Sequence, residues 1–244
     1  MSPALAASFF AAREDASLVV LEGFHALKHA LRFGAVVEAA VTSDPDGLAE
    51  LSAALAPDVA AALEALVQPI EPAALRALGF PRPPHTGVAA IARRPQFDLA
   101  ALLAGDLARP VVLLEDPRHL GNVGAVVRVA AAADAAGVVT TGTRDPWDAA
   151  ALRGAAGLHY ALPVGRADDG FDPAPRVLVA LDPDGDPLPS VEIPPGAVLA
   201  FGTERHGLSD ALLARADARL RIPMRDGVSS LNLATAVSAV LFSR

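Results

Sequence analysis

Six polar side chains with chemical potential are concentrated in three short turns, each of which follows an apolar run of strand length. Each turn contains glycine and leads into an Ala/Leu/Val-rich segment of helical character. Their amide, guanidinium, carboxylate and hydroxyl groups could bind a planar base, a carboxylate or a phosphate. The six residues are Asn122 and Arg128 in the first turn, Glu204 in the second, and Ser229, Ser230 and Asn232 in the third.

The first turn lies in the sequence HLGNVGAVVRVA, residues 119–130. Asn122 is expected to cap a helix, with Gly124 in its first turn and Arg128 four residues further on the same face. Because glycine leaves the helix surface bare, a backbone or a ligand could approach there while the arginine reaches over it. Ordinary capping with a solvated arginine is the simpler reading of this turn taken alone.

A dinucleotide site is an alternative for the same turn. His119, Gly121 and Gly124 occupy the glycine positions of G-x-G-x-x-G, with only the first glycine missing. Asp145 follows the next predicted strand, where a ribose-binding acid would stand. A Rossmann-type enzyme that acts on a small molecule therefore remains a competing hypothesis.

The second turn places Glu204 between Gly202 and Gly207, just past a buried strand. A carboxylate in this position is partly desolvated and needs a donor, which an arginine or a ligand amide could supply. A solvated glutamate in a surface turn is the alternative. Ser209 is expected to begin the following helix.

The third turn precedes the last helix. Ser229 or Ser230 is expected to cap that helix, which would leave Asn232 inside it, where asparagine is unfavourable unless its side chain has a partner. Main-chain groups at Ile222 and Met224 could grip a base or a carboxylate. A capped helix packed on a sheet is the simpler reading.

Charge and composition restrict the chemistry. The chain has 244 residues, no cysteine and a formal net charge of −8, so cysteine nucleophiles and thiolate metal sites are excluded. Lys28 is the only lysine, so a Gly-Lys-Ser/Thr phosphate loop is excluded too. A nucleic-acid partner would have to be met by a local arginine patch. The candidates are Arg82, Arg93, Arg94, Arg118, Arg128, Arg144, Arg153 and Arg225.

The elements that position these turns form an α/β pattern in two parts. Residues 1–95 are expected to form a small α/β domain, 96–109 a linker and 110–244 a second domain. In the second domain apolar strands alternate with helices, which is typical of a mostly parallel sheet covered on both faces. Ligands bind beyond the carboxyl ends of such strands, where all three turns would lie. No signal peptide or membrane-length apolar run is present, and a cytoplasmic protein is expected.

The turns together resemble a known family. The order N-x-G-x-x-x-R, FGxExxGL, and IPM followed by SLN is similar to the three motifs of TrmH/SpoU-type RNA 2′-O-methyltransferases of the SPOUT superfamily, over residues 110–244. LEGFHAL and HTGVAAIA look like the small, ribosomal-protein-like substrate-binding domain that many members carry. The resemblance implies a C-terminal trefoil knot, S-adenosylmethionine as cofactor, an rRNA or tRNA substrate, a homodimer and no metal.

The resemblance also assigns site residues. It implies that Arg128, Asn122, Glu204, Ser230 and Asn232 are the catalytic group. Because a guanidinium resists deprotonation, our hypothesis is that Arg128 clamps the phosphate beside the target ribose. The implied cofactor pocket is formed by Gly202, Ile222, Met224, Leu231 and Leu181. An RNA-binding protein that has kept the fold without catalysis is the other competing hypothesis.

Overall fold

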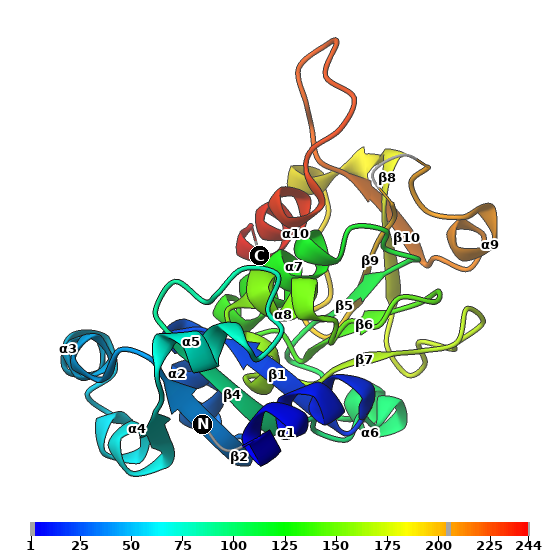
Figure 1. Ribbon diagram of the computed structural model, residues 1–244. Helices are drawn as coiled ribbons and strands as arrows, with labels where there is room; N and C mark the ends of the chain where they lie inside the picture. The colour runs from blue at the N-terminus through cyan, green and yellow to red at the C-terminus, as the bar shows by residue number, and fades with distance from the viewer. Residues whose placement is uncertain (1–2, 204–205, 244) are drawn as a thin grey trace. The chain divides into compact units, whose positions relative to one another are not determined.

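The computed structural model of the chain describes residues 3–203 and 206–243 and is drawn in Figure 1. It divides into two compact units. The first unit comprises Met1–Gln96 with Ala156–Ala161, and the second comprises Phe97–Ala155 with Leu162–Arg244. Among the described residues, no helix has the length and apolar character needed to cross a membrane.

The first unit is built on a four-stranded sheet with the order β1-β4-β2-β3. Strand β4 runs antiparallel to both β1 and β2, whereas β3 runs parallel to β2. The strands are β1 (Leu18–Glu22), β2 (Val37–Thr42), β3 (Val67–Pro69) and β4 (Val88–Arg93). The helical segments are α1 (Pro3–Glu14), α2 (Phe24–Arg32), α3 (Pro45–Leu55), α4 (Ala60–Leu66), α5 (Pro72–Arg76) and η1 (Leu158–Tyr160).

Helix α2 carries three basic residues, Lys28, His29 and Arg32. Each has a partner within the protein: Arg32 forms a bidentate ion pair with Asp58, with both nitrogen–oxygen distances at 2.6 Å. The Lys28 ammonium lies 5.6 Å from the centre of the Phe24 ring, and burial lowers the pKa of Lys28. His29 Nδ1 lies 2.8 Å from the carbonyl oxygen of Ala156. These contacts are structural, since they hold α2 within its own unit.

The second unit contains a six-stranded sheet with the order β10-β8-β9-β5-β6-β7, in which every pairing is parallel. Its central strands are continuous apolar runs that are buried along their whole length, as expected for a sheet covered on both faces. The strands are β5 (Val111–Leu114), β6 (Gly137–Thr140), β7 (Val164–Arg166), β8 (Leu178–Pro187), β9 (Val198–Phe201) and β10 (Ala218–Arg221). The predicted mostly parallel α/β fold is confirmed.

The helical segments of the second unit are α6 (Leu99–Ala104), α7 (Leu120–Ala132), α8 (Ala149–Ala155), η2 (Leu188–Ser190), α9 (Asp210–Leu213) and α10 (Leu233–Phe242). Helix α6 lies within the stretch that the sequence suggested as a linker. Leu102 and Leu103 of α6 are buried in the core of the second unit, so this stretch belongs to that core. Strand β9 lies on one side of β5 and β6 on the other. The direction of chain winding therefore reverses at β5, the position in such sheets where a crevice forms.

Helix α7 follows β5 and packs closely on α8. A β-carbon added at Gly124 would lie 2.1 Å from the carbonyl oxygen of Ala151 and 2.9 Å from the amide nitrogen of Ala155. The bare surface of Gly124 is therefore occupied by the backbone of α8, which is the first of the two alternatives predicted for this glycine. Small residues on both helices permit this close crossing.

Replacing Gly124 with alanine should therefore destabilise the second unit by roughly 1–3 kcal/mol, because the two helix backbones must separate. The measurement is urea unfolding followed through Trp147, the only tryptophan, which is buried in the same unit. Gly121 on the same helix is the matched control, since an added β-carbon meets nothing within 4 Å there. Gly121→Ala should be neutral or stabilising. Equal stability of the two variants would contradict the described contact.

Candidate functional site

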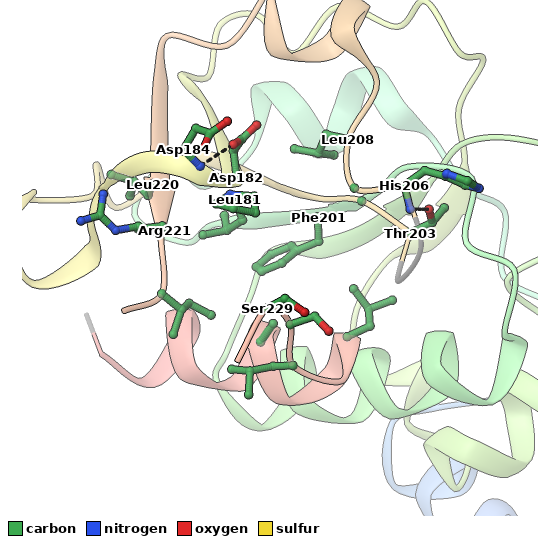
Figure 2. Close-up of a pocket in the computed structure, with 18 of the residues that line it drawn as sticks. Leu181, Asp182, Asp184, Phe201, Thr203, His206, Leu208, Leu220, Arg221 and Ser229 are labelled. Atoms are coloured by element: carbon green, nitrogen blue, oxygen red, sulfur yellow. Dashed lines mark hydrogen bonds between the residues drawn. The ribbon is translucent and has the colours of Figure 1, made fainter. Parts of the chain in front are cut away.

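A cavity of about 610 Å³ lies beside a bulge within β8 and at the carboxyl ends of β9 and β10 and is shown in Figure 2. Four segments line it: residues 181–184 within β8, the turn after β9, the end of β10 with the residues after it, and the start of α10. All five residues predicted for the cofactor pocket are among the lining residues, namely Leu181, Gly202, Ile222, Met224 and Leu231. Segments far apart in sequence therefore meet at one site.

A wide bulge in β8 supplies the first wall. The pairing with β10 jumps from Ala180–Arg219 to Asp186–Leu220, so residues 181–185 leave the ladder. Gly185 closes the bulge: an added β-carbon would lie 2.5 Å from the carbonyl carbon of Arg219. Arg221 Nη1 also donates to the carbonyl oxygen of Gly185 at 2.6 Å. Gly185 in the bulge is therefore held against β10 by a close backbone contact and by a hydrogen bond.

The bulge brings two carboxylates to the cavity wall that the sequence analysis missed, Asp182 and Asp184. The amide of Asp184 donates to Asp182 Oδ1 at 2.7 Å, and Figure 2 shows this bond beside Leu181. The dipeptides Asp-Pro and Asp-Gly in this stretch indicate a turn. They do not reveal that the turn interrupts a strand, since that depends on pairing with β10.

The turn after β9 forms the second wall. Thr203 and Gly207 exchange two backbone hydrogen bonds, of 3.1 and 3.0 Å, and close a short hairpin. A β-carbon on Gly202 would lie 2.0 Å from the carbonyl carbon of Gly207, so only glycine fits this position. His206 and Leu208 also line the cavity. Glu204, predicted to be functional, lies outside the described residues.

The third wall comes from the segment between β10 and α10. Ser229 and Ser230 line the cavity and are exposed. Neither serine caps α10, so that expectation is wrong. The cap is Asn232, whose Oδ1 accepts from the amides of Ala234 at 3.0 Å and Thr235 at 3.4 Å. Asn232 has non-helical dihedrals (φ −56°, ψ 142°) and is not inside the helix, because its short amide serves better as a cap than as a helix residue.

Asn232 also joins the third turn to the first. Its Nδ2 donates to Asn122 Oδ1 at 3.2 Å, across 110 residues of sequence. Asn122 is the third residue of α7, whose N-cap is His119, so the expectation that Asn122 caps the helix is also wrong. The two asparagines nevertheless lie together, so the first and third turns meet, as the sequence predicted. They border the cavity segments without being among its lining residues.

Arg128 lies further along α7 and is exposed. It is not among the residues that line the cavity. An exposed guanidinium is available to an anionic partner, whereas Gly124 on the same helix is buried. Within the described ranges, no group of three or more His, Asp or Glu side chains could hold a metal ion.

Asn232 offers a test of this arrangement that separates capping from the link to Asn122. Asn232→Ala should lower stability by about 1 kcal/mol, because two helix amides lose their acceptor. Asn232→Ser should keep the cap and most of the stability, yet its shorter side chain cannot reach Asn122. Urea unfolding measures the first effect. If the link to Asn122 orders the site, both variants should lose activity; full activity in Asn232→Ser would contradict a functional role for the link.

The chain is similar in sequence to known proteins. The model described as the SpoU rRNA Methylase family matches residues 109–242. An uncharacterized tRNA/rRNA methyltransferase from Mycobacterium bovis is 35% identical over 176 residues, which cover 65% of this chain and 59% of that protein. The 23S rRNA (guanosine(2553)-2′-O)-methyltransferase of Bacillus subtilis is 30% identical over 162 residues, which cover 64% and 63%. The chain thus spans less than two thirds of the length of these relatives.

Solved structures show the same fold. The SpoU methyltransferase AviRb from Streptomyces viridochromogenes, in complex with the cofactor AdoMet, has a TM-score of 0.75 and 26% identity, with 94% of this chain and 90% of that chain covered. An AdoMet-bound rRNA methyltransferase from Sinorhizobium meliloti has a TM-score of 0.76 and covers 99% of this chain and 94% of that chain. Because this structure is 23% identical in sequence, the similarity shows a shared fold alone.

Proposed function

The chain belongs to the SpoU rRNA Methylase family, and we propose that it transfers a methyl group from S-adenosylmethionine to a ribose 2′-hydroxyl of structured RNA, either rRNA or tRNA. The observation that carries this proposal is the cavity built from the second and third predicted turns and the β8 bulge, to which the bond between Asn232 and Asn122 joins the first turn. The relatives named as rRNA 2′-O-methyltransferases support the reaction class.

The cavity fits the proposed cofactor. Its size is typical of a small-molecule site, and Leu181, Ile222 and Leu231 offer apolar surface to a flat base. Gly202 keeps the backbone bare where a side chain would block the turn. We assign Gly202, Ile222, Met224, Leu231 and Leu181 to cofactor binding. When bound, S-adenosylmethionine supplies an electrophilic methyl group on a sulfonium, which is already a good leaving group.

Arg128 is assigned to the RNA substrate. A ribose hydroxyl is a weak nucleophile, so it must be held in line with the methyl group and must lose its proton. Guanidinium resists deprotonation and cannot act as a base. Its planar donors suit a phosphate, so Arg128 is proposed to hold the phosphate beside the target ribose. The proton then passes to that phosphate or to water.

The remaining polar residues are proposed to order the site. The bond between Asn122 and Asn232 fixes the start of α10 against α7, and Ser230 reaches the cavity from the same segment. Ser230 and Asn232 are assigned to holding the cofactor loop and the nucleotide. Asn122 and Glu204 are assigned to ordering Arg128 and its loop.

A C-terminal trefoil knot and a homodimer are also proposed, because the family resemblance implies both. The contact between α10 and α7 is compatible with the knot. Residues 1–95 are assigned to RNA substrate binding and 110–244 to methyl transfer, in a cytoplasmic protein. Sedimentation equilibrium tests the dimer, since a monomer at micromolar concentration would exclude it.

Most of the arginines that the sequence suggested for RNA binding are exposed, namely Arg82, Arg93, Arg118, Arg128, Arg144, Arg153 and Arg225. Arg118 pairs with Asp116 at 2.6 Å and Arg93 pairs with Glu38 at 2.9 Å, so an RNA phosphate would compete with a carboxylate at these two. With a net charge of −8, the protein should bind RNA through a small number of such contacts, which favours a selective footprint.

Calorimetry and methyl incorporation together test the function. The protein should bind S-adenosylmethionine and not NAD, and should transfer a labelled methyl group to rRNA or tRNA. Binding of NAD alone would favour the Rossmann alternative. RNA binding without methyl transfer would favour the non-catalytic alternative. Mapping 2′-O-methyl positions in RNA from cells with and without the gene would then identify the target nucleotide.

A further inference from the structure

The turn between β9 and α9 forms one wall of the cavity. Gly202 and Gly207 bound it, and glycine loses more conformational entropy than other residues when it is ordered. Among the described residues, two backbone bonds between Thr203 and Gly207 and a bond from the His206 amide to Thr203 Oγ1 at 3.2 Å join the turn to itself. The position of the turn against the cavity therefore depends on how its two ends are held.

Glu115 contacts both ends of this turn. Its amide donates to the carbonyl oxygen of Phe201 at 3.0 Å, which extends the pairing of β5 with β9 by one residue. Its carboxylate accepts two hydrogen bonds from Ser209, one from the backbone amide to Oε2 and one from the hydroxyl to Oε1, each 2.6 Å long. Phe201 precedes the turn and Ser209 follows it, so one residue holds both ends.

The contact with Ser209 is more than the cap of α9. Ser209 Oγ already accepts from the amide of Leu212 at 3.2 Å, which is the capping bond. The two bonds to Glu115 come in addition and use a donor from the backbone and a donor from the side chain. Both involve an ionised acceptor, and such bonds are about twice as strong as neutral ones. They join positions 94 residues apart in the sequence.

We propose that Glu115 is a positioning residue for methyl transfer: through Ser209 it holds the turn after β9 in place, and thereby the cofactor-facing backbone at Gly202. This inference rests on the proposed function. Glu115 follows β5, next to the first motif, whereas the turn it holds contains the second motif. The Glu115 carboxylate therefore connects the segment of the first motif to the turn that contains the second motif.

The experiment compares five variants of the full chain: Glu115→Gln, Ser209→Ala, the double variant of these two, Ser209→Thr, and Asp98→Asn as a matched control. Asp98 also offers a carboxylate to a helix-start amide, that of Ala101 at 2.9 Å, but lies outside the cavity lining. Calorimetry gives the dissociation constant for S-adenosylmethionine, and hydrogen exchange without cofactor reports the turn amides. Both are measured at a temperature where Trp147 fluorescence shows every variant to be folded.

Glu115→Gln should weaken cofactor binding about 10-fold, a loss of roughly 1.4 kcal/mol, and speed exchange in residues 202–208. Ser209→Ala should act in the same direction, and the double variant should be no worse than the worse single one. Ser209→Thr, which keeps both donors, should restore binding. Asp98→Asn should leave both quantities unchanged.

The inference is overturned if Glu115→Gln binds the cofactor and exchanges like the wild type, or if the two single effects simply add. A purely structural role would lower the unfolding midpoint and leave the dissociation constant unchanged, which also rejects the proposal. Failure of the proposed function is a separate result. In that case the wild type itself neither binds S-adenosylmethionine nor methylates RNA, whereas the exchange data still show whether Glu115 holds the turn.

Discussion

Arg128→Ala is expected to reduce methyl transfer at least about 100-fold, which is the usual effect of removing a group that stabilises charge in the transition state. The guanidinium is exposed on α7 and is not part of the cavity lining. Its loss should therefore leave the fold and the binding of S-adenosylmethionine nearly unchanged. Single-turnover methyl transfer and calorimetry on the same preparation measure the two quantities.

Two further variants sharpen this test. Arg128→Lys keeps the charge but has no planar pair of donors, so it should restore little of the activity if the phosphate is held by two bonds. Arg76→Ala removes an exposed arginine in the first unit and should keep normal activity. Normal turnover in Arg128→Ala would exclude the phosphate clamp. A parallel loss of cofactor binding would place Arg128 in the cofactor site instead.

The second large effect concerns Arg176, which is 5% exposed. Its guanidinium donates to five backbone carbonyl groups, and all five of its donors have an acceptor. Three acceptors lie in or just after α6, and the other two precede β5 and β9. They are Leu102, Leu103, Asp106, Arg109 and Gly196, at 2.8–3.1 Å.

Arg176→Ala should destabilise the second unit by at least about 3 kcal/mol, because several buried carbonyl groups lose a charged donor and a cavity remains. Arg176→Lys should recover only part of this, since an ammonium has three donors and a different geometry. Urea unfolding followed by Trp147 fluorescence reports the unit concerned. Arg215→Ala is the control: Arg215 is exposed and donates to the carbonyl of Phe171, so it should cost below about 1 kcal/mol. Similar losses of unfolding free energy in Arg176→Ala and Arg215→Ala would show that the five hydrogen bonds of Arg176 do not stabilise the second unit.

The pocket residues could be predicted because they lie in local patterns. Gly202 follows an apolar strand and begins a glycine-bounded turn, and Ile222 and Met224 follow the next strand. The carboxyl ends of parallel strands meet at one edge of the sheet, so residues just past those ends converge whatever the strand order. The family motifs then distinguish these positions from ordinary turns.

The wrong predictions of helix caps arose where several neighbouring residues are almost equally good caps. Ser229, Ser230 and Asn232 are all good helix caps, and the sequence does not rank them. In the structure α10 packs on α7, and Asn232 satisfies both the helix amides and Asn122. Asn122 itself was displaced from the cap to the third helical position. In each case a contact from a distant segment decided between alternatives that cost about the same.

The sequence by itself determined the alternation of strands and helices, the division of the chain into two α/β parts, and the positions of the turns past the strand ends, since all of these depend on short-range periodicity and turn chemistry. The resemblance to the family then singled out the pocket residues within those turns, but not Asp182 and Asp184 of the β8 bulge. The tertiary structure decided the partners. It placed α8 against Gly124, Ser209 on Glu115 and β10 beside the β8 bulge. Such pairings join residues tens of positions apart, and no local preference specifies them, because they arise only when the strand order and the packing of the helices are fixed.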